Sequence, residues 1–371
     1  MQVDLLPLLH SPSGTTRTLC VHRFGQPGAR PKAYIQAALH ADELPGVLVA
    51  HELITLLNDA ETKGELLGEV LVVPAANPVG LSQEFLGIHH GRFALADGFN
   101  FNRGFADVSR GLVGALSRSS SRPQHDASDH LRAHFLNLLA QQKASSESAA
   151  LKAQLLALAI DADVVLDLHC DSEAVMHLYT LPSLTKRIAP LARLLGASVC
   201  LTAAESGEGP FDEACSRPWQ VAATTVPNVT LATPCLAATI ELRGERDVSP
   251  VLAKKDARAI FDFLHVEGIV HGESQPLPNH EYLVLPLAGT EPVVAPVAGV
   301  LVFATEPGGT VAQGEVIARL LDPVTGLSTE VKAGISGLLF ARAASRWASA
   351  GKRIGKIAGS EIIRSGTLLS P

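Results

Sequence analysis

Two short motifs contain the side chains best suited to bind a catalytic metal. His40-Ala-Asp-Glu43 ends one apolar stretch of the sequence, and Asp167-Leu-His169 ends another. A hydrolytic zinc site commonly has three nitrogen or oxygen ligands and a fourth position open for water, and two histidines with one glutamate form such a set. We therefore predict that His40, Glu43 and His169 hold one zinc ion per chain.

Each motif has a simpler explanation when it is considered alone. His-x-x-Glu spacing occurs often by chance, and His169 could be a hydrogen-bonded core histidine. Asp167 could orient His169 as a carboxylate partner of a metal ligand, or it could cap the strand end. Asp42 could in principle reach a second ion, although a solvated turn residue is the simpler interpretation. The prediction therefore depends on the two motifs meeting in space.

A carboxylate within an apolar segment is the candidate proton carrier. Thr239-Ile-Glu241-Leu-Arg243 places Glu241 in a segment expected to be a buried strand, where an unpaired charge is costly. Beside an attacking water, such a glutamate can accept the proton and return it to the leaving nitrogen. The structural alternative is a buried ion pair of Glu241 with Arg243 or with a lysine.

A third motif could anchor a substrate carboxylate. In Asn100-Phe-Asn102-Arg103, the guanidinium of Arg103 offers a rigid fork for a carboxylate, and the amide of Asn102 can add a donor. The alternative is an arginine on a surface loop.

Taken in order along the chain, these motifs resemble the succinylglutamate desuccinylase/aspartoacylase family, a branch of the zinc carboxypeptidase fold. The resemblance covers about residues 18–270. It implies zinc ligands at the three positions above, a substrate carboxylate on Asn102 and Arg103, and a general base and acid at Glu241. One departure is Asn100, which stands where the family usually has an aspartate.

The resemblance also implies two further groups near the substrate. The family uses an arginine upstream of the Asn-Arg pair to stabilise an oxyanion, and Arg92 is the candidate. Carboxypeptidases use a mobile tyrosine. The chain has three tyrosines, Tyr34, Tyr179 and Tyr282, and Tyr282 is the candidate.

These observations together predict an amidohydrolase that acts on carbon–nitrogen bonds other than peptide bonds. The expected substrate is a small carboxylate-bearing amide, such as an N-acyl amino acid. Two alternatives stay open: a zinc carboxypeptidase for short peptides, and a non-catalytic metal-binding or docking protein.

The elements that must position these residues alternate between strands and helices. Apolar runs predict strands and helical spacing predicts helices, and the strands are expected at residues 32–39, 70–75, 164–166 and 237–242, the helices at 46–57, 127–159, 184–195 and 256–270. Near-continuous apolar strands that alternate with helices predict a mixed, mostly parallel sheet with helices on both faces. Sites in such folds lie at the carboxyl ends of the strands.

A change of composition over residues 271–286 predicts a domain junction, with a catalytic domain at 1–272 and a β-rich domain at 273–371. The second domain contains a weak repeat that resembles the barrel-sandwich hybrid of biotinyl and lipoyl carriers. No lysine occupies the turn at 322–328, so we expect the fold without the carrier chemistry.

The net charge of −7 offers no field that would gather nucleic acid or an anionic membrane. The five cysteines form no CxxC pair, which indicates reduced thiols and a cytoplasmic location. No signal peptide or membrane span is expected, and assembly into a homo-oligomer is left open.

Overall fold

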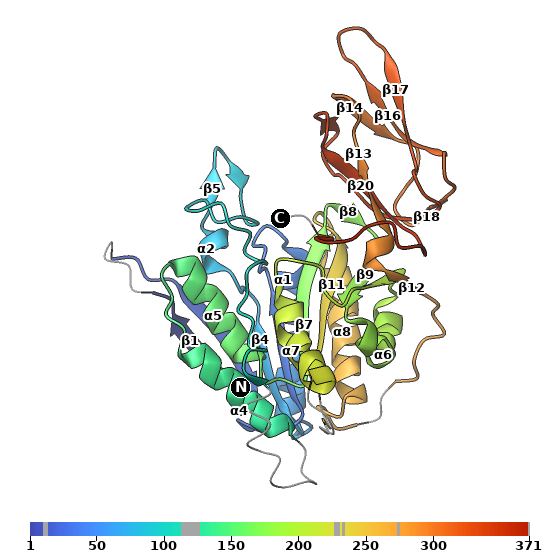
Figure 1. Cartoon of the computed structure of the whole chain (residues 1–371). Coiled ribbons are helices and arrows are strands. Elements are labelled where there is room, and N and C mark those ends of the chain that lie inside the picture. The colour runs from blue at the N-terminus through green and yellow to red at the C-terminus, as the bar shows by residue number, and fades with distance from the viewer. Residues whose placement is uncertain (10–13, 113–126, 226–230, 232–233, 273–274, 370–371) are drawn as a thin grey trace.

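The centre of the molecule is a nine-stranded sheet with the strand order β1-β2-β4-β3-β7-β11-β9-β10-β12 (Figure 1). The computed structural model describes residues 1–9, 14–112, 127–225, 231, 234–272 and 275–369. The nine strands are β1 (Gln2–Pro7), β2 (Thr18–Phe24), β3 (Lys32–Ala37), β4 (Glu69–Val73), β7 (Val164–Asp171), β9 (His177–Thr180), β10 (Val199–Thr202), β11 (Leu236–Gly244) and β12 (Leu283–Pro286).

The strands in the middle of this sheet are parallel. β3 pairs in parallel with β4 and β7, β7 with β11, and β10 with both β9 and β12. The pairs β1–β2, β2–β4 and β9–β11 are antiparallel. The mixed, mostly parallel sheet predicted from the apolar runs is therefore confirmed.

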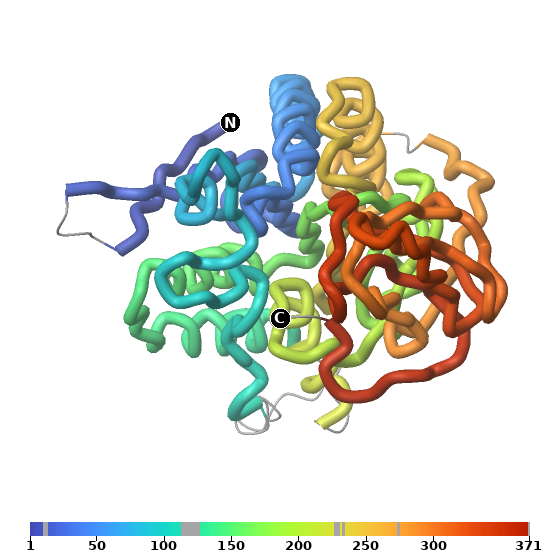
Figure 2. Tube along the Cα trace, turned by 90° about the horizontal axis from the view of Figure 1, so that it is seen from above, coloured from blue at the N-terminus to red at the C-terminus, as the bar shows by residue number. Residues whose placement is uncertain are grey.

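Helices cover both faces of the sheet, as predicted (Figure 2). One face packs under α1 (Pro45–Thr62), α6 (Thr185–Leu195) and α8 (Pro250–Val266), and the other under α4 (Ser128–Ala140), α5 (Glu147–Ala159) and α7 (Phe211–Thr225). Because side chains alternate along a strand, Ile35 of β3 enters the first core while Tyr34 enters the second. A short helix, α2 (Pro78–Leu81), and the turns η1 (Pro182–Leu184) and η2 (Leu287–Gly289) complete the helical elements described.

The helical pattern predicted over residues 127–159 divides into two helices, α4 and α5. The hydroxyl of Ser146 accepts a hydrogen bond from the backbone amide of Ala149 at 3.1 Å and so caps the start of α5. A serine that bonds to the backbone in this way favours a helix start over a helix interior. The Ala/Leu periodicity alone could not reveal this interruption.

The C-terminal part of the chain is all β, as predicted, and has a hydrophobic core of its own. Its two sheets have the orders β13-β20-β18-β15 and β17-β16-β14-β19. The strands are β13 (Thr290–Val294), β14 (Gly299–Phe303), β15 (Thr310–Val311), β16 (Val316–Leu321), β17 (Ser328–Lys332), β18 (Gly337–Arg342), β19 (Trp347–Ala348) and β20 (Arg353–Ala358). The likeness to biotinyl and lipoyl domains stays a prediction.

Strand pairing connects the central sheet and the C-terminal part at two places. β12 extends the central sheet beside β10, while β8 (Glu173–Ala174) pairs with β18 of the C-terminal part. The predicted boundary between residues 272 and 273 stays a prediction, because residues 273 and 274 lie outside the described residues. A two-stranded hairpin of β5 (Glu84–Phe85) and β6 (Ile88–His89) stands apart from both sheets. Within the described ranges, none of the helices combines the length and the apolar character needed to cross a bilayer.

Candidate active site

The predicted site residues lie where three neighbouring parallel strands end. His40 follows β3, His169 lies near the end of β7, and Glu241 of β11 is the direct register partner of His169. Adjacent parallel strands bring their carboxyl ends to one edge of the sheet, so residues far apart in the chain meet there. The sheet topology explains how the separate motifs converge.

A tight turn after β3 brings His40 and Glu43 to the same point. The backbone amide of Glu43 donates to the carbonyl of His40 at 3.1 Å, and α1 begins two residues later at Pro45. Gly46 lets this helix start close to the sheet, since a Cβ there would lie 3.0 Å from the Cβ of Leu168. The sequence from 40 to 46 thus builds the strand-to-helix corner that the motif requires.

The three predicted metal ligands converge. Glu43 Oε1 lies 2.9 Å from His40 Nδ1, and Glu43 Oε2 lies 2.7 Å from His169 Nδ1. One ligand atom from each of the three residues falls within 4.8 Å of the others, so the cluster could hold a metal ion. The backbone amide of Cys170 also donates to Glu43 Oε2 at 3.1 Å and fixes the carboxylate.

The other ring nitrogens of the two histidines point away from this centre toward acceptors. His40 Nε2 lies 2.8 Å from Asn100 Oδ1, and His169 Nε2 lies 2.9 Å from Asp167 Oδ2. Both acceptors favour a proton on Nε2, which leaves the lone pairs of the Nδ1 atoms directed at the centre. The donor set and its orientation therefore fit a divalent metal. Asp167 lies where the sequence hypothesis of an orienting carboxylate requires it.

The buried charges of the cluster shift the pKa values of its three side chains. Burial opposes the charge on Glu43, but His40 and His169 outweigh it and hold the pKa of that carboxyl well below its usual value. Burial would also lower the pKa of His169, but the carboxylates of Asp167 and Glu43 raise it well above the usual value. Burial and the nearby Arg92 lower the pKa of His40. A metal ion would take the place of the proton that these groups share.

Arg92 reaches this centre, while Tyr282 does not. Arg92 Nη1 lies 3.1 Å from Glu43 Oε1 and 3.2 Å from His40 Nδ1. Gly91 makes this approach possible, because a Cβ at that position would lie 2.0 Å from the backbone nitrogen of Asp42. Tyr282 instead packs against the hydrophobic core on the α1 face of the sheet.

Glu241 carries a buried carboxylate oxygen, Oε2, that has no hydrogen-bond partner among the described residues. Burial, together with the charges of Glu43 and Asp171, raises its pKa to about 8. The ion pairs considered as an alternative are not formed: Arg243 pairs with Asp256, and Lys356 pairs with Asp171. The carboxylate is therefore available to act on a ligand.

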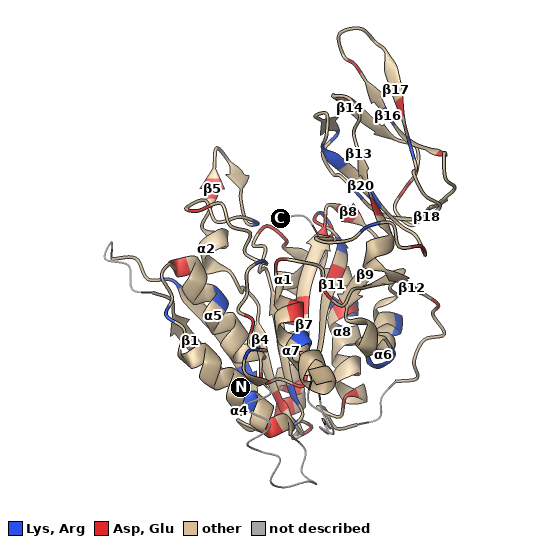
Figure 3. Cartoon of the chain, in the orientation of Figure 1, with Lys and Arg blue, Asp and Glu red and all other residues tan. Residues whose placement is uncertain are grey.

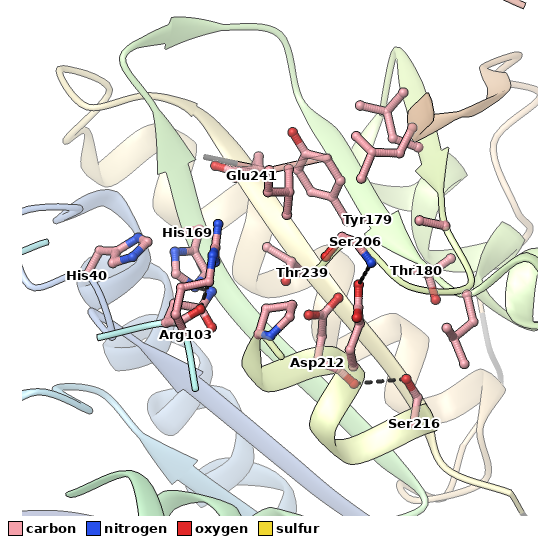
Figure 4. A pocket seen from close by; sticks show the side chains of 18 of the residues that line it. His40, Arg103, His169, Tyr179, Thr180, Ser206, Asp212, Ser216, Thr239 and Glu241 are labelled. Carbon is pink, nitrogen blue, oxygen red and sulfur yellow. Dashed lines mark hydrogen bonds between the residues drawn. The ribbon is translucent and has the colours of Figure 1, made fainter. Parts of the chain in front are cut away.

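A pocket extends from the metal cluster along the edge of the sheet (Figure 4). Asn102 and Arg103 form part of its wall and are fixed in place. Asn102 Oδ1 accepts from the backbone amide of Phe211 at 2.9 Å, and Arg103 Nη1 donates to the carbonyl of Asn102 at 2.7 Å. Lys152 Nζ holds the carbonyl of Arg103 at 2.7 Å. Burial, and then the charge of Arg92, lower the pKa of Arg103.

Several wall residues of this pocket were not predicted from the sequence. They come from β9, from α7 and its preceding loop, and from the C-terminal part of the chain: Tyr179, Ser206, Asp212, Glu213, Leu287, Arg353, Lys356 and Leu369. The only sequence signal was a choice among three tyrosines, of which Tyr179 rather than Tyr282 lines the pocket. The others belong to no motif, and only the packing of distant elements brings them to the site.

Charged residues are unevenly spread along the chain, and several lie where the central sheet meets the C-terminal domain (Figure 3). A second hollow there is lined by acids of the catalytic part, including Asp42 and Glu245, and by bases of the C-terminal part, including Arg342 and Lys352. It shares Glu43, Glu241 and Arg353 with the wall of the first pocket. The C-terminal domain therefore borders the site directly.

Comparison with known proteins gives a consistent result. The family model of the succinylglutamate desuccinylase/aspartoacylase catalytic domain matches residues 29–266. A succinylglutamate desuccinylase/aspartoacylase family protein of Shewanella amazonensis is 25% identical, with a TM-score of 0.86 over 96% of this chain and 98% of that chain. No curated protein matches the sequence.

Two further structures share the fold. A protein described with the same family name, from Shewanella frigidimarina, is 24% identical with a TM-score of 0.84 over 96% of each chain. The product-bound ectoine utilization protein EutE of Ruegeria pomeroyi is 19% identical with a TM-score of 0.64, over 96% of this chain and 94% of that chain. These alignments span both parts of the molecule.

Proposed function

The chain belongs to the succinylglutamate desuccinylase/aspartoacylase family, and from this premise we propose that it is a zinc-dependent deacylase of small N-acyl amino acids. One observation carries the proposal. The Nδ1 atoms of His40 and His169 face the carboxylate of Glu43, and their Nε2 atoms are held by acceptors. Glu241, on the adjacent strand, has a carboxylate oxygen with no partner among the described residues.

His40, Glu43 and His169 would hold the ion, and their nitrogen and oxygen donors suit zinc. A divalent cation bound there would supply Lewis acidity, which activates water and polarises the amide carbonyl. Glu241 takes the proton of the attacking water and delivers it to the leaving amine nitrogen. A group with a pKa raised to about 8 is a good proton acceptor, and a nearby cation would lower that value toward neutrality.

Two arginines divide the remaining work. Arg103, with the amide of Asn102, holds the carboxylate of the amino acid and so fixes the scissile bond. Arg92, at the ligand cluster, stabilises the negative charge that develops on the carbonyl oxygen. Fixed donors of this kind act where the charge forms and need no reorganisation during the reaction.

The C-terminal domain serves in this proposal as a wall of the pocket. Leu287, Arg353, Lys356 and Leu369 approach the site from that side, which favours a small substrate over a peptide. The turn between β16 and β17 contains Asp322 and Thr325, joined by a hydrogen bond of 2.8 Å, and no lysine. We therefore assign this domain no carrier role, whatever its ancestry.

A panel assay tests the proposal. The zinc-loaded protein is incubated with N-acetyl, N-formyl and N-succinyl amino acids and with short peptides, and the release of free amine is measured. We expect hydrolysis of N-acyl amino acids and a loss of about 10³-fold in kcat for Glu241→Gln, with metal content unchanged. Glu245→Gln, on the same side of the site, is the matched control and should retain full activity.

The other outcomes are decisive. Undiminished hydrolysis by Glu241→Gln would remove Glu241 from the chemistry. Faster hydrolysis of peptides would identify a carboxypeptidase. Zinc binding with no hydrolysis over the whole panel would identify a non-catalytic metal-binding protein.

A further inference from the structure

The end of the pocket away from the metal cluster contains a buried carboxylate that the proposed reaction does not use. Asp212 is the second residue of α7, and its side chain lines the pocket with only 7% of its surface exposed. Figure 4 shows Asp212 between the Arg103 side of the pocket and Thr180. A carboxylate buried to this degree ordinarily has a cationic partner.

Asp212 has no such partner in the part of the chain that the structure describes. It forms no ion pair there, although the backbone amide of Glu213 favours its charged form. Burial, together with the charge of Glu213, raises the pKa of Asp212 to about 7. The carboxylate of the neighbouring Glu213 has a different setting, because it accepts a hydrogen bond from the backbone amide of Ser206 at 2.8 Å.

The position of Asp212 at the start of a helix does not account for its burial. An acid that caps a helix gains from the free amides and from the helix dipole, which stabilise its charged form and lower its pKa. The pKa of Asp212 is shifted in the opposite direction. The amide of Ala214, in the first turn, already donates to the carbonyl of Pro210 at 3.0 Å.

A buried hydroxyl group in the same pocket, that of Ser206, points to a missing ligand independently. Ser206 is 2% exposed and lines the pocket, yet its Oγ has no hydrogen-bond partner among the described residues. Thr239 is 7% exposed and lines the same wall. By contrast, Ser216 Oγ donates to the carbonyl of Asp212 at 2.9 Å, and Thr180 Oγ1 donates to that of Ala237 at 2.8 Å. A buried hydroxyl without a partner is costly unless a ligand supplies one.

We infer that this end of the pocket binds an ammonium group, and that the substrates are N-acyl diamino acids. The inference rests on the proposed function. The substrate carboxylate binds Arg103, the amide lies at the ligand cluster, and the ammonium pairs with Asp212 beside the hydroxyl of Ser206. The negative charge of Glu208, followed by those of Asp212 and Glu213, favours the charged form of Arg103. A ligand that carries both a carboxylate and an ammonium group complements Arg103 and Asp212 together.

A matched substrate series tests this inference with the zinc-loaded full-length enzyme. Nα-acetyl derivatives of lysine, ornithine and 2,4-diaminobutyrate are compared with those of norleucine, norvaline and glutamate. We expect kcat/KM for the best cationic substrate to exceed that of its neutral counterpart by about 100-fold, because a site built for a polar group is left unsatisfied by an apolar one. Nε-acetyl-lysine determines which of the two nitrogens carries the acyl group.

Asp212→Asn keeps the shape of the side chain and removes its charge. In this variant the cationic preference should fall to about threefold or less, while hydrolysis of the neutral substrates persists. Glu205→Gln is the control, since Glu205 is exposed and pairs with Arg217 outside the pocket. It should leave the preference unchanged.

Failure of the inference and failure of the proposed function give different results. If the wild-type enzyme hydrolyses neutral or acidic N-acyl amino acids as well as the cationic ones, the inference is overturned and the deacylase function stands. If it hydrolyses no N-acyl compound, the proposed function itself is lost. If Asp212→Asn does not fold, the wild-type substrate series alone decides the question.

Discussion

The two ends of the pocket differ in whether their buried polar groups have hydrogen-bond partners. At the metal end, the polar groups around His169 have partners in a continuous chain: Tyr34 donates to Gln36 at 2.8 Å, Gln36 donates to Asp167 at 2.9 Å, and Asp167 accepts from His169 at 2.9 Å. At the other end, Ser206 Oγ has no hydrogen-bond partner among the described residues, and Asp212 forms no ion pair with them. Apart from Glu241, whose Oε2 has no partner among the described residues, the metal end is complete before a ligand arrives, and the other end becomes complete when one binds.

The difference shows how a fold separates a constant task from a selective one. Holding a metal ion requires ligands fixed in one geometry, and the register of neighbouring strands supplies it, because Gln36 of β3 lies directly opposite Asp167 of β7. Selecting a substrate requires polar groups that are satisfied only by the correct ligand, and their burial costs stability until it binds. The unpaired end lies on α7 and its preceding loop, outside the strand ladder.

The largest expected effect is that of removing a metal ligand. His169→Ala removes one metal ligand and takes one hydrogen-bond partner from each of the buried carboxylates of Glu43 and Asp167. We expect the bound zinc to be lost and hydrolysis to fall by more than about 10⁴-fold, since the metal supplies both the activated water and the polarised carbonyl. Elemental analysis of the purified variant measures the metal directly.

His51→Ala is the matched control for this change, because His51 is exposed on α1. It should bind zinc at the wild-type ratio. Near-stoichiometric zinc in His169→Ala would place the metal elsewhere and would remove the basis of the comparison between the two ends.

A smaller loss is expected at the middle of the pocket. Arg103→Lys keeps the positive charge but loses the planar fork that binds a carboxylate through two hydrogen bonds. We expect KM for an N-acyl amino acid to rise by about 30- to 100-fold with the metal content intact, measured by steady-state kinetics. Arg217→Lys, outside the pocket, is the control. An unchanged KM would show that another cation of the pocket wall, such as Arg353 of β20, binds the substrate carboxylate.

The chain of hydrogen bonds behind His169 predicts a third, milder loss. In Asp167→Asn, the new amide nitrogen faces the amide nitrogen of Gln36, which places two donors opposite each other. The alternative is that the Gln36 amide rotates by half a turn, and Tyr34 must then accept a hydrogen bond instead of donating one. Because a partner that orients a metal ligand contributes to affinity, we expect zinc to bind about 10- to 100-fold more weakly. Competition with a chelator measures this change. Unaltered affinity would show that Glu43 alone orients His169.

The convergence of the residues at the metal end could be predicted from the sequence because they lie in motifs at strand ends. His40, Glu43, His169 and Glu241 each follow or end an apolar run, and parallel strands bring such ends together. Asp212 gave no comparable signal. Its role depends on how α7 packs over the sheet edge, which no local pattern encodes.

The wall contributed by the C-terminal domain was unpredictable for the same reason. Lys356 meets Asp171 across 185 residues of sequence, and the repeat in the β-rich segment indicates a fold without indicating its docking face. Tyr282 was considered for its place in the junction, but β12 follows it directly and joins the central sheet, which directs the ring to the hydrophobic core. Sequence patterns here identify elements more reliably than the contacts between them.

At the other end of the pocket, the aspartate-to-asparagine change Asp212→Asn should make the metal-free protein more stable. The pKa of Asp212 rises from 3.8 in an ordinary setting to about 7 in the folded protein, so the folded state binds its proton more tightly than the unfolded state. The resulting destabilisation is absent below about pH 4, grows with rising pH, and is complete above about pH 7. Asp212→Asn removes it. At about 1.4 kcal/mol per pKa unit, the pKa shift limits the gain in unfolding free energy to about 4 kcal/mol. Because the asparagine amide is still buried, we expect a gain of about 1–2 kcal/mol near pH 8.5.

Urea unfolding of the metal-free wild type and Asp212→Asn at about pH 8.5 and about pH 4.5 measures the difference in stability. A variant that is less stable than the wild type at the higher pH would show that Asp212 already has a stabilising partner, and the contrast between the two ends would fail.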